Sequence, residues 1–162
     1  MRIYSDATGE GNMAGLVIFP ESSGKIPVVF TSKADRALTG LAAWTNKIYV
    51  FELFAAAATV FPLRQQLTGK KIVLFVDNEA ACADLSGGTA KNRCALLLVY
   101  TLWSVVAQFD LQRWIGRVPS AQNPADLPFR NRALSPAAEA QQELPDVSQM
   151  SNFCDLSRLF QK

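Results

Sequence analysis

Four acidic residues stand apart from the other charged side chains of this sequence. Each lies in apolar or loop surroundings, with no Lys or Arg directly beside it: Asp6, Glu52, Asp77 and Asp126. Lone carboxylates on a chain of mixed strands and helices indicate a divalent-metal site, because Mg²⁺ and Mn²⁺ prefer hard oxygen ligands. Two such ions about 4 Å apart can activate a water and stabilise the leaving oxygen of a phosphodiester.

Glu52 carries the strongest argument for a metal. It lies in the middle of the helical stretch KIYVFELFAAAATV, between large apolar residues on both sides. An unpaired buried carboxylate costs several kcal/mol or shifts its pKa until it is neutral. A bound cation would remove that cost, so we predict that Glu52 is a metal ligand.

The other three acids also have ordinary structural explanations. Asp6 can shape the turn that follows its strand, and Asp77 can cap the helix that follows its strand. Asp126 lies three residues after Asn123, where an acid can bond a helix cap and favour the helix dipole. These roles are compatible with metal binding, so both interpretations stay open at this stage.

Composition excludes several classes of chemistry. The 162 residues include no histidine, which removes Ser–His and Cys–His catalysis, a His general base and His-ligated zinc. The formal charge of +2 argues against gripping nucleic acid by bulk charge.

The three cysteines form no CxxC pair and are expected to be core residues in a reducing compartment. No stretch approaches the roughly 18 apolar residues of a membrane span, and no signal peptide is recognised. We therefore expect a cytoplasmic or nuclear protein.

The elements that must position the acids follow from the hydrophobic pattern. Apolar and β-branched residues at 2–7, 13–19 and 26–31, separated by turns, predict an antiparallel meander of three strands. Residues 47–61 predict a helix that is apolar all round and therefore buried. The five apolar residues 72–76 then predict a central strand covered on both faces.

The rest of the core is expected to alternate helices and a strand. Residues 78–85 and 90–108 predict helices, the second capped by Thr89. Residues 111–118 predict a strand, and Asn123-Pro124 has the pattern of a helix start. The chain is thus expected to be α/β, with three antiparallel strands followed by βαβ crossovers.

The chain is expected to divide at about residue 130. Residues 1–130 form the predicted catalytic domain, and residues 131–162 are expected to be a tail rich in Ala, Gln, Glu, Ser and Pro. Within the tail, a possible amphipathic helix near 152–161 repeats apolar residues at helical spacing, and it is a candidate contact for the domain or a partner. Its apolar residues are Phe153, Leu156, Leu159 and Phe160.

Taken in order, the four acidic stretches resemble the ribonuclease H family, in particular the domains attached to retroelement reverse transcriptases. The stretches are YSDATGEGNMAG, FELFAAA, FVDNEAA and VPSAQNPADLPFR, and the resemblance covers residues 2–130. It implies a ribonuclease H-like fold, with a five-stranded mixed sheet flanked by helices. It also implies hydrolysis of the RNA strand of an RNA/DNA hybrid, leaving a 5′ phosphate and a 3′ hydroxyl.

The resemblance further assigns roles to individual residues. Asp6 would bridge two Mg²⁺ ions, which Mn²⁺ could replace. Glu52 and Asp77 would complete the ligand set of one ion, and Asp126 that of the other. Polar groups near the scissile phosphate or the hybrid backbone would come from Thr8, Asn12, Asn78, Ser120 and Asn123. Recognition would depend on 2′-hydroxyl groups and groove shape rather than on base sequence.

Two departures from the family pattern bear on activity. Many members carry a mobile His in the loop before the last acid, whereas residues 117–122 have none, so another residue would have to replace it. Many cellular members also carry a basic protrusion, but residues 87–108 hold only Lys91 and Arg93. Affinity for the hybrid would then depend on a linked reverse transcriptase domain or on a modest set of scattered cations. These are Lys70, Lys71, Arg113, Arg117, Arg130 and Arg132.

Two alternatives remain beside a nuclease of this type. A transposase or integrase core usually ends in a Glu about 35 residues after the second Asp, and residues 111–116 contain none. A non-catalytic module that binds hybrids or serves as a structural part would usually lose one acid, but all four are present here. Activity and metal binding distinguish these alternatives.

Overall fold

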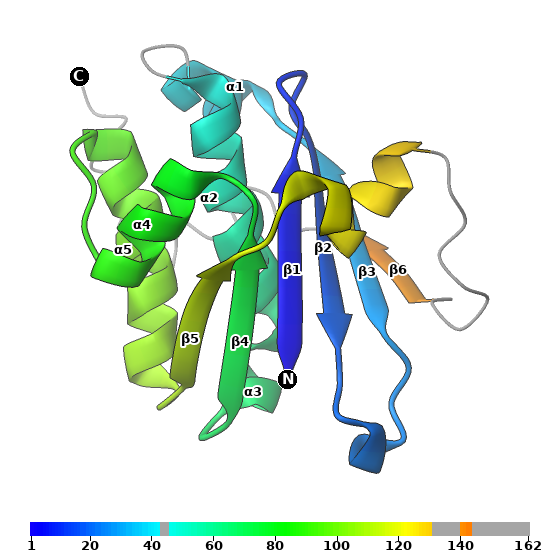
Figure 1. Cartoon of the computed structure of the whole chain (residues 1–162). Helices are drawn as coiled ribbons and strands as arrows, with labels where there is room; N and C mark the ends of the chain where they lie inside the picture. The colour runs from blue at the N-terminus through cyan, green and yellow to red at the C-terminus, as the bar shows by residue number, and fades with distance from the viewer. Residues whose placement is uncertain (43–45, 131–139, 144–162) are drawn as a thin grey trace.

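The structure, a computed structural model, describes residues 1–42, 46–130 and 140–143. Its described part contains a mixed sheet with strand order β5-β4-β1-β2-β3-β6 (Figure 1). The strands are β1 (Arg2–Ala7), β2 (Asn12–Ile18), β3 (Val28–Lys33), β4 (Lys71–Val76), β5 (Gln112–Arg117) and β6 (Ala140–Glu143).

The pairing of the strands agrees with the predicted topology. β1 pairs antiparallel with β2 and β2 with β3, so the first three strands form the expected meander. β4 lies parallel to β1 on its other side, and β5 lies parallel to β4. The five predicted strands are therefore confirmed, and their crossovers carry helices as parallel connections require.

The helices gather on one face of the sheet (Figure 1). They are α1 (Arg36–Ala42), α2 (Lys47–Val60), α3 (Arg64–Leu67), α4 (Glu79–Gly87) and α5 (Arg93–Gln108). Short 3₁₀ helices connect the strands: η1 (Glu21–Ser23), η2 (Phe61–Leu63), η3 (Ser120–Gln122) and η4 (Pro124–Arg130). Of these, η4 lies over the opposite face, where Ala125 packs on Leu16 and Val29.

Helix α2 is the centre of the core. Its residues from Val50 to Val60 are all buried, as the apolar composition predicted. The helix passes so close to β2 that a Cβ atom at Gly15 would come within 2.0 Å of the Thr59 Oγ1. Glycine is required at this position by the close approach of the helix. Glu52 is two helical turns from Thr59, so the same face of α2 carries it toward the sheet.

Some helix boundaries differ from the sequence predictions, because local capping residues decide where a helix begins. Asn92, not Thr89, caps α5, since its Oδ1 accepts hydrogen bonds from Cys94 N and Ala95 N at 2.8 and 3.2 Å. Helix α1 lies in a segment for which the sequence pattern predicted no helix. Helix α2 ends at Val60, close to the predicted end, and the chain then turns through η2, which contains Pro62, into α3.

The segment expected to be a tail contributes one strand. Ala140–Glu143 pairs parallel with β3 and extends the sheet to six strands among the described residues. The amphipathic helix predicted near 152–161 lies outside the described residues. In the part of the chain that the structure describes, no helix combines the length and apolar character that crossing a membrane requires. Cys82 and Cys94 are free thiols.

Candidate active site

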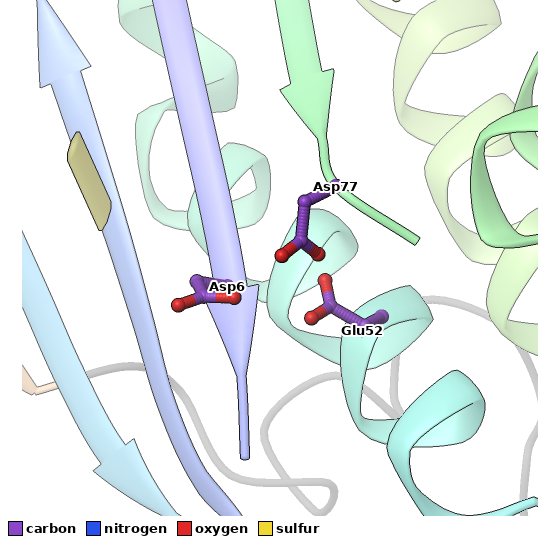
Figure 2. A group of neighbouring side chains, drawn as sticks. All are labelled: Asp6, Glu52 and Asp77. Atoms are coloured by element: carbon purple, nitrogen blue, oxygen red, sulfur yellow. The ribbon is translucent and has the colours of Figure 1, made fainter. Parts of the chain in front are cut away.

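Three of the four predicted acids meet at one end of the sheet (Figure 2). Asp6, Glu52 and Asp77 each offer a carboxylate oxygen, and these oxygens lie within 4.8 Å of one another. The parallel pairing of β1 and β4 explains the first contact: Tyr4 is opposite Phe75, so two residues further the chain places Asp6 level with Asp77. Adjacent strands are about 4.8 Å apart, so the side chains of two level residues on neighbouring strands can reach the same cation.

Glu52 is held by the backbone of β1. Its Oε1 accepts a hydrogen bond from Ala7 N at 2.9 Å, and the side chain is 1% exposed. Its Oε2 is also buried and accepts no hydrogen bond from any described donor. Burial raises the pKa of Glu52 to about 10, with further contributions from the charges of Asp77 and Asp6. In the metal-free protein this carboxyl group is therefore protonated at neutral pH.

Asp6 interacts with each of the other three acids. It is 5% exposed, and burial raises its pKa to about 7, with smaller contributions from the negative charges of Asp77 and Asp126. The influence of Asp126 on Asp6 indicates that the fourth acid lies near the cluster, although it is outside the group whose oxygens fall within 4.8 Å. Mutual repulsion of this kind is relieved by protons or by cations.

Asp126 is positioned by a buried asparagine. The side chain of Asn123 donates from Nδ2 to the Ser5 carbonyl oxygen at 2.9 Å and accepts from Ala125 N at 3.2 Å. The Asp126 N–H donates to the Asn123 carbonyl oxygen at 3.1 Å. These bonds fix the start of η4 to β1 beside Asp6. The polar groups of Asn123, which was predicted to contact substrate, are thus used within the protein.

The other residues predicted to contact substrate lie around the acidic cluster and have different structural roles. Thr8 accepts a hydrogen bond from Asn12 N at 3.1 Å and thereby closes the turn between β1 and β2. Asn78 caps α4 by accepting from Ala81 N at 3.0 Å, so the cap following β4 is Asn78 rather than Asp77. Ser120 is exposed at the start of η3.

An open groove runs beside the β1–β2 turn. It has a volume of about 540 Å³ and passes between β3 and η4; its lining residues include Thr8, Asn12, Thr31, Lys33 and Phe129. Thr8 and Asn12 follow Asp6 along the chain, so the groove extends from the acidic end of the sheet. Its walls combine hydroxyl, amide, ammonium and aromatic groups, which suit a sugar–phosphate backbone, with one carboxylate, that of Glu10.

The predicted cations are not all near the acids. Arg117 Nε donates to the Asp77 carbonyl oxygen at 3.3 Å, and an Arg117 nitrogen lies 3.9 Å from Glu79. By contrast, Lys70 and Lys71 precede β4 or begin it, at the opposite end from Asp77. The side chain of Arg130 and all of Arg132 lie outside the described structure.

One supporting contact was missed in the sequence. The Tyr49 hydroxyl donates to Asp84 and joins the first turn of α2 to α4. Burial raises the pKa of Tyr49, and its hydrogen bond to Asp84 adds to the effect. The contact helps to hold α4, and with it Asp77 at its start, beside the helix that carries Glu52. The partners are 35 residues apart, so no local pattern reveals the pair.

Solved structures provide the comparison. RNase H1 from the halophilic archaeon Halobacterium salinarum NRC-1 is similar with a TM-score of 0.49 and 16% identity, over 76% of this chain and 89% of that one. The N-terminal RNase H domain of a Mycobacterium tuberculosis protein, studied as a fusion with maltose-binding protein, has a TM-score of 0.50 and 16% identity, over 77% and 88% of the two chains. No protein-family model matches the sequence, and no curated protein matches it. The chain therefore has the predicted ribonuclease H-like fold.

Proposed function

We propose that the chain is a metal-dependent ribonuclease H that hydrolyses the RNA strand of RNA/DNA hybrids. One observation carries the proposal: three carboxylates from β1, α2 and the end of β4 converge within 4.8 Å on a ribonuclease H-like fold. A cluster of this kind in a buried setting is unfavourable without cations or protons.

The donor set fits a hard divalent cation. Asp6, Glu52 and Asp77 supply only oxygen ligands, and the buried Glu52 Oε2 accepts no hydrogen bond from the described residues. Magnesium and manganese favour carboxylate oxygens, whereas zinc sites usually include Cys or His. We assign these three residues, together with Asp126, to two Mg²⁺ ions that Mn²⁺ can replace. When bound, such ions activate a water for attack and stabilise the leaving oxygen.

The residues of the chain then have distinct tasks. Ala7 N–H holds the Glu52 Oε1, and the carboxylate of Glu52 lies beside those of Asp77 and Asp6 (Figure 2). Asn123 fixes the loop that brings Asp126 to Asp6. In the reaction, water attacks the phosphorus atom and the bond to the 3′ oxygen breaks, leaving a 3′ hydroxyl and a 5′ phosphate.

The hybrid is proposed to lie along the groove beside the β1–β2 turn. Thr8 and Asn12 line this groove and Asn78 and Ser120 flank the acids, so they are proposed contacts to the sugar–phosphate backbone. The finer assignment, a domain that works with a linked or associated reverse transcriptase, rests on the resemblance of the four acidic stretches. Such a partner would supply affinity that the few cations near the site do not.

A cleavage assay tests the proposal. The protein is incubated with a labelled RNA/DNA hybrid in Mg²⁺, in Mn²⁺ or in chelator, beside matched RNA/RNA and DNA/DNA duplexes. We expect metal-dependent cutting of the RNA strand of the hybrid alone, and its loss in Asp77→Asn. Asp110→Asn is the matched control, because Asp110 is exposed at the opposite end of the sheet and asparagine tolerates its positive φ of 51°. Absence of cutting in both metals would refute the nuclease and favour a binding or structural module.

A further inference from the structure

Trp114 is an exposed aromatic residue on the sheet face opposite the helices. Its side chain is 60% exposed, although it lies within strand β5. Neighbouring strands place Phe75 and Tyr4 on the same face, and the three rings form a row. Phe75 meets Trp114 edge-on, with ring centroids 6.1 Å apart, and stacks on Tyr4 at 4.8 Å. Together the three rings form an apolar surface on this face of the sheet, and contiguous apolar surfaces often mark interaction sites.

The indole of Trp114 lies against the sheet itself. A Cβ atom at Gly116 would come within 2.3 Å of Trp114 Cζ3 and 2.5 Å of Cη2, so the benzene ring covers the Gly116 backbone. The backbone of Gly116 does not have a positive φ. Glycine therefore makes room for the ring above it and is not needed for a turn. One face of the indole rests on the sheet, and the exposed area lies on its other side.

This ring is close to the acidic cluster. In the β4–β5 register, Gly116 is opposite Phe75 and Arg117 is opposite Val76, the residue before Asp77. The ring over Gly116 is thus about two residues, or roughly 7 Å, along the sheet from Asp77 and one strand away. Arg117 hydrogen-bonds to the Asp77 backbone and adds a cation between the two features.

A small hollow adjoins the ring at the outer edge of β5. Its volume is about 220 Å³, and Trp114 lines it together with Ser86, Arg113 and Ile115. The Arg113 guanidinium lies 3.5 Å from the Trp103 ring centroid, and its Nε is buried without a hydrogen-bond partner in the described part of the chain. Alternation along β5 places Arg113 on the helix side, against Trp103, and its buried Nε is closed to a ligand, so Trp114 is the group of this hollow that can contact a base.

We propose that Trp114 stacks on an unpaired base of a nucleic-acid strand that continues past the acidic cluster, with the exposed Arg117 binding a phosphate beside Asp77. This inference rests on the proposed nuclease function and extends its substrate. Bases paired inside a hybrid already stack on their neighbours, so the ligand is the single-stranded continuation of a hybrid. Stacking on an aromatic ring accepts any base, which predicts a preference for overhangs without a sequence preference.

Binding in chelator tests the inference separately from cleavage. Fluorescence anisotropy of the full chain is measured with a labelled blunt RNA/DNA hybrid and with the same hybrid carrying a six-nucleotide dT overhang. We expect the wild type to bind the overhang probe more tightly. Trp114→Ala should reduce the ratio of the two affinities toward one, a loss of roughly 5- to 100-fold for one or two stacked bases. Gly116→Ala should act similarly, because its methyl group displaces the ring.

The matched control is Tyr100→Ala. Tyr100 is an exposed aromatic residue on α5, 50% exposed, and its removal should leave the overhang preference unchanged. A wild type without overhang preference, or a Trp114→Ala variant that retains it, would overturn the inference even if the hybrid is still cut in Mg²⁺.

Discussion

Glutamine in place of Glu52 should stabilise the metal-free protein while it removes the proposed metal site. The pKa of Glu52 is about 10 in the folded chain against an ordinary value of 4.5. At pH 7 the unfolded chain carries this group ionised, so folding must take up a proton. The cost over these 2.5 pH units, at 1.36 kcal/mol each, is about 3 kcal/mol. Glutamine carries the same shape without that cost.

The sign of the pH dependence follows from the raised pKa. The folded state holds the Glu52 proton more tightly than the unfolded state, so this group opposes folding increasingly as the pH rises from about 4.5 toward 10. The stability difference between Glu52→Gln and wild type should therefore be near zero at pH 4.5 and reach about 3 kcal/mol at pH 7. For a chain of 162 residues this corresponds to roughly 6–12 °C in melting temperature.

The assay is thermal unfolding in chelator between pH 4.5 and 8, followed by circular dichroism. Glu21→Gln is the matched control, because Glu21 is exposed in η1 and should change the free energy of unfolding by less than about 0.5 kcal/mol. Saturating Mg²⁺ should then stabilise the wild type more than the variant, since only the wild type retains the full ligand set. A variant that melts at or below the wild-type temperature at pH 7, or a difference that does not grow with pH, would refute the reasoning.

Four further predictions concern the site and the tail. Asp77→Asn should lower cleavage of the hybrid by more than about 100-fold with an unchanged circular dichroism spectrum; a variant that still cuts would remove Asp77 from the site. Asn123→Ala should lower the free energy of unfolding in urea by about 1–3 kcal/mol, because it leaves the Ser5 carbonyl oxygen without this buried donor; unchanged stability would show that the bond is unimportant. Mg²⁺ affinity measured by calorimetry should rise steeply from pH 6 to pH 8, by about tenfold from the proton displaced on Asp6, whose pKa is about 7, and by about a further 100-fold from the proton displaced on Glu52, whose pKa is about 10; an affinity independent of pH would contradict this. A chain ending at Asn131 should retain measurable cleavage, whereas an inactive truncation would assign the removed segment to the catalytic unit.

The sequence was sufficient for the elements whose signals are local. Alternation and glycine-containing turns indicated the first three strands, and the unbroken apolar stretch around Glu52 indicated a buried helix. The same stretch identified Glu52 itself, because a carboxylate in such surroundings needs a partner. Local caps were less predictable: Asn92 rather than Thr89 begins α5, since several polar residues in one loop can each cap a helix. The strand Ala140–Glu143 was missed because a polar edge strand has no hydrophobic pattern.

Other features depended on contacts between distant residues. The Tyr49–Asp84 and Asn123–Ser5 hydrogen bonds join positions 35 and 118 residues apart, and neither pair has a sequence signal. The exposed ring of Trp114 over Gly116 likewise depends on how the side chain folds back along its strand. The sequence thus determined which acids stand alone and which elements carry them, because hydrophobic periodicity and turns act over a few residues. Only the tertiary structure decided that three of these acids meet, since the parallel register of β1 with β4 and the close approach of α2 are set by packing of the whole core.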